Sequence, residues 1–149
     1  MTVTRIRTAA VLAACALVVG CSDRPRMATV KGTVTLDGAP LVAGTVTFES
    51  PGLRPATAKI VRGELTEVST FEPNDGAPVG SHRVAVAASE DAASAVVADP
   101  GQATPKGSYM VGKSIIPRAY NDPATSKLTV EVTPGENVVE LKLFSTGPK

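Results

Sequence analysis

The chain has 149 residues, with 15 lysines and arginines against 14 acidic residues, a single histidine and no tryptophan. This balance predicts no basic surface for nucleic acid or anionic lipid, and the scarcity of aromatic rings argues against base stacking and aromatic sugar platforms. The 13 glycines and 12 prolines favour a turn-rich chain without reaching the level of a low-complexity sequence.

The N-terminal segment has the layout of a secretory signal. Residues 1–7 carry two arginines and no acid, and the 13 residues of 8–20 are uncharged and mostly Ala, Val and Leu. As a helix, this apolar run would span about 20 Å, which is short of the roughly 30 Å hydrocarbon core of a bilayer. Polar residues 22–24 follow directly, so the pattern predicts a signal peptide over residues 1–20 and no stable membrane span.

The apolar run ends in Val18-Val19-Gly20-Cys21, which resembles the lipobox of bacterial lipoproteins. The resemblance implies that Cys21 becomes the first residue, that its thiol receives a diacylglyceryl group, and that its new amine is acylated by a fatty acid such as palmitate. Two alternatives stay open: an ordinary signal peptide with an incidental cysteine, and cleavage before Cys15. The motif before Cys15 matches the lipobox better locally, but it leaves only about seven apolar residues, the lower end of the usual range. The switch from apolar to polar sequence falls at Cys21, which favours Cys21.

Lipidation at Cys21 predicts how the chain is divided and where it is located. Residues 21–27 form a short tether, and residues 28–145 form one domain, because the mature chain of about 130 residues suits one domain rather than two. Two or more acyl chains give stable attachment to a membrane on its extracytoplasmic side. Ser22 after the modified cysteine favours the outer membrane or cell surface over the inner membrane. A lipidated Cys21 leaves the domain without a disulfide, so its stability depends on its core.

Alternation of apolar and polar residues with a period of two predicts β-strands throughout the mature chain. Asp37-Gly38 predicts a tight turn that makes residues 27–49 a β-hairpin, and residues 134–137 predict a second hairpin loop. The predicted strands lie at 30–36, 44–49, 56–61, 64–70, 82–88, 128–133 and 139–143.

Two segments do not follow this alternation. Residues 89–113 lack apolar periodicity and are rich in Ala, Ser, Gly and Pro, which predicts a flexible surface excursion. Residues 114–120 form a short apolar segment that Pro117 interrupts, which is compatible only with a sheet edge. No part of the mature chain has a helical pattern. Seven short strands joined by Gly/Pro turns predict an all-β fold, a two-sheet antiparallel sandwich.

Five segments of the mature domain carry a family resemblance. Residues 30–41 (VKGTVTLDGAPL) look like the opening of transthyretin-like, or carboxypeptidase regulatory-like, domains. Residues 70–80 (TFEPNDGAPVG), 116–120, 125–128 and 134–137 are similar to small lipoproteins of planctomycete-type bacteria. The resemblance implies a prealbumin-like, seven-stranded antiparallel Greek-key sandwich, and it implies no activity, because fold analogy alone does not supply one.

Few residues are candidates for chemistry. His82 is the only histidine, so a zinc site of three or four His and Cys ligands is excluded, and we expect His82 at the rim of the core with one satisfied nitrogen. Asp75-Gly76 is expected to form a turn rather than a calcium loop, which needs more spaced oxygen ligands. Glu90, Asp91 and Asp99 are expected to be solvated charges of the excursion.

An enzyme of the transthyretin fold, hydroxyisourate hydrolase, relies on more than one histidine and a Tyr-Arg-Gly-Ser ending, whereas this chain has one histidine and its last six residues, 144–149, read FSTGPK. We therefore expect no catalytic, cofactor-binding or metal-binding residues, and lipidation at Cys21 as the only modified site. The leading hypothesis is a membrane-anchored, non-enzymatic accessory or protein-interaction domain of the cell envelope. The alternatives are a carbohydrate- or small-ligand-binding β-sandwich module and, less favoured, an unrecognised hydrolase.

Overall fold

The structure is a computed structural model, and it describes residues 24–90, 93 and 112–149. The predicted signal peptide, Cys21 and most of the excursion predicted at 89–113 lie outside these ranges. The first strand begins at Met27, six residues after Cys21, which is close to the predicted start of the domain at residue 28.

The described chain is an all-β domain, as the alternation predicted. Its one sheet contains nine strands, two of which are only two residues long. The strands are β1 (Met27–Leu36), β2 (Ala39–Pro40), β3 (Ala43–Glu49), β4 (Ala56–Val61), β5 (Glu64–Ser69), β6 (Ala77–Pro78), β7 (Gly80–Ala87), β8 (Leu128–Val132) and β9 (Glu136–Leu143). A four-residue 3₁₀ turn, η1 (Arg118–Asn121), follows the excursion.

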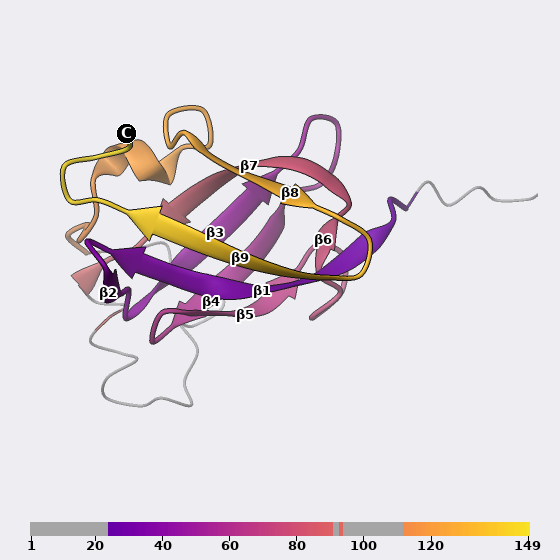
Figure 1. The fold of residues 1–149 in the computed structure, drawn as a ribbon, viewed down its shortest axis with the longest axis horizontal. Helices are drawn as coiled ribbons and strands as arrows, with labels where there is room; N and C mark the ends of the chain where they lie inside the picture. The colour runs from indigo at the N-terminus through magenta and orange to yellow at the C-terminus, as the bar shows by residue number, and fades with distance from the viewer. Residues whose placement is uncertain (1–23, 91–92, 94–111) are drawn as a thin grey trace, which may run out of the picture.

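The sheet curls so that its ends enclose one core. The strands follow the order β2-β1-β5-β4-β3-β7-β8, and β6 and β9 both pair with β1. Figure 1 shows β1 and β9 in front of β3 and β4, with β7 and β8 along the upper side. Most pairs are antiparallel, but β9 runs parallel to β1 along the length of both strands, from Thr29↔Glu136 to Leu36↔Leu143.

The predicted inward residues form this core. Val34 is fully buried and Leu141 is 3% exposed, and the two are partners in the parallel ladder between β1 and β9. The intervening positions of β9, such as Glu140 and Lys142, are exposed. The strand registers read from the sequence are therefore confirmed on both strands. The core continues through Phe48, Ile60 and Val86 on the opposing strands.

The hairpin predicted over residues 27–49 is wrong, because its two long strands, β1 and β3, do not pair with each other. After the turn at Asp37 and Gly38, both at positive φ, only the two residues of β2 form the expected hairpin with β1, through Leu36↔Ala39 and Thr35↔Pro40, and β3 does not pair with β1. The backbone then leaves β1, and β3 pairs with β4 and β7 instead. Pro40 has no N–H for a longer ladder, and Leu41 turns into the core, where it is buried.

The hairpin predicted around residues 134–137 is also wrong. β8 pairs with β7, and β9 crosses over to pair with β1. The Asn137 side chain holds the crossing: its Oδ1 accepts the Thr133 N–H at 2.9 Å, and its Nδ2 donates to the Thr133 carbonyl at 2.8 Å and the Thr29 carbonyl at 3.3 Å. These bonds take the place of a ladder between β8 and β9.

Candidate functional site

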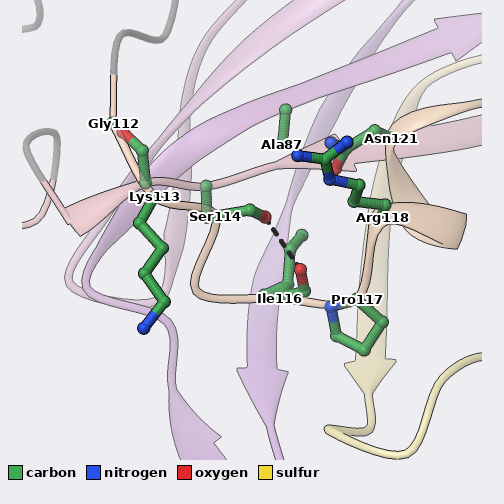
Figure 2. A pocket seen from close by; sticks show the side chains of 10 residues that line it. Ala87, Gly112, Lys113, Ser114, Ile116, Pro117, Arg118 and Asn121 are labelled. Carbon is green, nitrogen blue, oxygen red and sulfur yellow. Dashed lines mark hydrogen bonds between the residues drawn. The ribbon is translucent and has the colours of Figure 1, made fainter.

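An open hollow of about 600 Å³ lies at one end of the domain, where the described chain enters and leaves the excursion. Its lining combines apolar side chains, such as Ala87, Ile116 and Pro117, with polar ones, such as Lys113, Arg118 and Asn121 (Figure 2). The lining residues are Ala87, Ala88, Ser89, Gly112, Lys113, Ser114, Ile116, Pro117, Arg118 and Asn121.

Backbone hydrogen bonds hold the two stems of the excursion together beside the hollow. Ser89 and Ser114 form an isolated antiparallel bridge, the Ile115 N–H donates to the Ala88 carbonyl at 3.2 Å, and the Glu90 N–H donates to the Lys113 carbonyl at 3.1 Å. The ends of the excursion are therefore part of the folded domain, and their placement depends on the end of β7.

The segment predicted as an edge strand at 114–120 instead forms the wall of the hollow. Pro117, which cannot donate to a ladder, precedes the 3₁₀ turn η1, and the Tyr120 N–H donates to the Pro117 carbonyl at 3.0 Å. Ile116 and Tyr120 are buried, and the Tyr120 hydroxyl accepts the N–H of Phe144 at 3.0 Å. These contacts fix Arg118 and Asn121 on the rim.

The charge on this rim is positive. Lys113 and Arg118 are the only charged residues among the described lining, both are exposed, and they stand at opposite sides of the hollow in Figure 2. Neither cation forms an ion pair with an acidic side chain in the part of the chain that the structure describes. A hollow flanked by two such cations favours an anionic group over a cationic one.

The described lining offers no arrangement for nucleophilic catalysis. It contains no histidine, cysteine or carboxylate, and the Ser114 hydroxyl donates to the carbonyl of Ile116 at 2.8 Å. A nucleophilic serine requires an adjacent base. The described rim is therefore suited to binding, through the cations Lys113 and Arg118 and the amide of Asn121.

His82 lies far inside the domain rather than at its rim. Its side chain is 1% exposed, Nε2 lies 2.7 Å from the carbonyl of Pro78, and the ring makes an edge contact with Phe48. Because a carbonyl only accepts, we assign the ring proton to Nε2. Nδ1 has no hydrogen-bond partner among the described residues. The expectation of one satisfied nitrogen is confirmed, and the role of the ring is packing.

Asp75 forms the predicted turn between β5 and β6. Its carboxylate accepts the backbone N–H groups of Thr70, Phe71 and Glu72 at 2.6, 2.9 and 3.0 Å. Burial raises the pKa of the Asp75 carboxyl, but these backbone hydrogen bonds lower it by more, so the pKa lies below its ordinary value. The carboxylate is thus occupied in shaping its own loop. No group of three or more His, Cys, Asp or Glu residues is gathered in the described ranges.

The hollow and the N-terminal tether lie at opposite ends of one strand. At the start of β7, the Val79 N–H donates to the carbonyl of Arg26 at 2.8 Å, which places the tether there. At the end of β7, Ala87 lines the hollow. The eight residues of β7 span about 25 Å at ~3.3 Å per residue. Figure 1 shows the same opposition, with the start of β1 at one end of the domain and η1 at the other.

No pattern in the sequence pointed to Lys113, Arg118 or Asn121 as site residues. They come from the end of the excursion and from the turn after Pro117, and only the fold brings them beside Ala87. Pro117 was the available sequence signal for the turn that carries Arg118 and Asn121, because a proline favours a turn over a strand.

No protein-family model matches the chain, and neither curated proteins nor solved structures give a significant match. The described residues include no helix that is long and apolar enough to cross a bilayer.

Proposed function

We propose that this chain is a lipid-anchored extracytoplasmic lipoprotein whose β-domain is a non-enzymatic accessory or protein-interaction module of the cell envelope. The signal-like segment and the lipobox-like motif before Cys21 support the anchor. The observation that carries the function is the opposition of tether and hollow along β7. A domain anchored at its Arg26 end presents the Lys113 and Arg118 rim about 25 Å away, at the end opposite the anchor.

The resemblance to transthyretin-like domains belongs to this proposal, and so does a Greek-key sandwich. Strands β3, β4 and β5 are joined by short turns, and β7 returns after a longer connection to lie beside β3. The resulting order β7-β3-β4-β5 supports a Greek-key connection, in which the fourth strand lies beside the first. We infer two layers, with β5, β1 and β9 facing β4, β3, β7 and β8 across the shared core.

The anchor is tested by metabolic labelling with a fatty-acid analogue. Cys21→Ser should abolish the label and leave the protein unprocessed or soluble, whereas Cys15→Ser should stay labelled and membrane-bound. Label that persists in Cys21→Ser and disappears in Cys15→Ser would falsify the assignment.

The interaction site is tested by crosslinking in native membranes. A photo-reactive residue at Asn121 should crosslink a protein, and the yield should fall when Lys113→Glu and Arg118→Glu are combined. Lys142→Glu, a charge reversal on the exposed face of β9, is the matched control and should leave the yield unchanged. Equal yields from all three proteins would mean that the hollow is not the contact surface.

The hollow also favours the second candidate, a carbohydrate- or small-ligand-binding module. Its two cations, Lys113 and Arg118, suit a ligand with a carboxylate, such as an acidic sugar. Calorimetric titration with acidic and neutral sugars separates the candidates. Binding of the acidic sugar alone, lost in Arg118→Gln, would favour this second function over the first.

A further inference from the structure

An exposed aromatic ring lies between two arginines at the tether end of the domain. The ring of Phe71, 36% exposed, has the Arg24 guanidinium carbon 5.8 Å from its centroid and that of Arg54 5.9 Å away. Arg24 also pairs with Glu72 at 3.0 Å. We call Arg24, Arg54, Phe71 and Glu72 the Phe71 cluster.

The fold holds this cluster in place before anything binds. The three backbone hydrogen bonds that Asp75 accepts fix Thr70, Phe71 and Glu72, and the Thr70 hydroxyl donates to the Gly76 carbonyl at 2.8 Å. Because the loop is already ordered, little conformational entropy is lost when a partner covers the exposed Phe71 ring.

The position of the cluster limits what that partner can be. Arg24 follows Cys21 by three residues, so their Cα atoms are at most about 11 Å apart even when the chain is fully extended. The Phe71 ring is then within one arginine side chain of that position. If Cys21 carries acyl chains, the distance between the cluster and the headgroup layer is limited to the length of residues 21–24 plus one arginine side chain.

The chemistry of the cluster suits that layer. An aromatic ring partitions into the boundary between headgroups and acyl chains, and a guanidinium binds phosphate oxygens through paired hydrogen bonds. The overall charge balance predicted no basic surface toward lipid, but a net charge does not report where the charges gather. The Arg24 charge is paired with Glu72, whereas Arg54 pairs with no acid among the described residues.

We propose that the Phe71 cluster docks onto the anchoring membrane, with the Phe71 ring entering the interface and Arg54 and Arg24 binding lipid phosphates. This inference rests on the proposed lipid anchor at Cys21. It gives the domain one orientation, with β7 leading away from the membrane and the hollow at its far end. The anchor keeps the cluster at a high effective concentration near the headgroups, so even a weak contact is populated.

The test uses the full lipidated protein in vesicles of phosphatidylethanolamine and phosphatidylglycerol. The chain has no tryptophan, so Phe71→Trp introduces a single indole. Lipids brominated on their acyl chains should quench its fluorescence about twofold, as expected for a ring ~5–10 Å deep in the interface. Adding Arg54→Glu should remove most of this quenching.

The matched control is Phe144→Trp at the opposite end of the domain, because this ring also lies beside a cation, Lys149 Nζ at 4.3 Å. Its indole should not be quenched. Flotation with vesicles in the absence of quenching at position 71, or equal quenching at both positions, would overturn the docking alone. Failure to float would overturn the anchor, and the docking with it.

Discussion

At the scale of single residues, burial decides the effect of a substitution. Leu141 is 3% exposed and pairs with Val34 in the middle of the core, whereas Lys142 points to solvent. Leu141→Ala should lower the free energy of unfolding by about 2–5 kcal/mol, because it leaves a cavity. Lys142→Ala should change it by less than about 0.5 kcal/mol. Urea unfolding of both variants measures the difference, and equal effects would contradict the observed register.

The ionisation of the Asp75 carboxyl makes the free energy of unfolding depend on pH in the acid range. Its pKa is lowered in the folded state, so its stabilisation is fully present above the unfolded value of about 3.9 and is lost as the pH falls through the folded value. Asp75→Asn should cost about 2 kcal/mol at neutral pH, because bonds to an ionised acceptor are replaced by weaker ones. The cost should shrink below about pH 4.

Chemical denaturation of Asp75→Asn and wild type at neutral and acid pH measures this change. Glu131→Gln, an exposed carboxyl on β8, is the control. An Asp75→Asn cost that is independent of pH would show that the three N–H groups do not depend on the ionised carboxylate.

At the scale of elements, the pairing of β1 with β9 depends on one glycine. A Cβ at Gly32 would overlap the carbonyl oxygen of Val139 and would lie 2.6 Å from its Cγ2. Gly32→Ala should therefore separate the two strands and cost more than about 3 kcal/mol, or prevent folding. Thr33→Ala, at an exposed neighbouring position, should cost far less. Thermal unfolding compares the two, and similar melting temperatures would mean that β9 does not approach β1 so closely.

At the scale of the whole molecule, the domain should tolerate a shorter excursion. The sequence of residues 92–103 has no apolar periodicity, and the bridge between Ser89 and Ser114 ties the stems together. Deleting these residues should shift the melting temperature little, because the free energy of loop closure changes slowly with length. A large decrease would show that the segment packs against the core.

The anchor and the fold together predict how the molecule acts. The tether and the Phe71 cluster share one end of β7, and the cationic hollow lies at the other. A lipid-anchored domain of this shape would meet partners within about 25 Å of the membrane surface.

The sequence by itself determined the elements and their inward faces. A period of two separates buried from exposed side chains within each strand, so Val34, Val84 and Leu141 could be placed in the core without a structure. The lipobox-like motif before Cys21 is likewise read from adjacent residues alone, without the tertiary structure.

Only the tertiary structure decided which strands pair. The turn at Asp37-Gly38 and the loop after Pro134 both looked like hairpins, because turn chemistry reports that a chain reverses but not which strand it joins next. The hollow, with Lys113 and Arg118, and the Phe71 cluster, with Arg24 and Arg54, are made of residues from separate loops. Their proximity follows from burying all of the strands around one core, and this long-range packing leaves no periodic signal in the sequence.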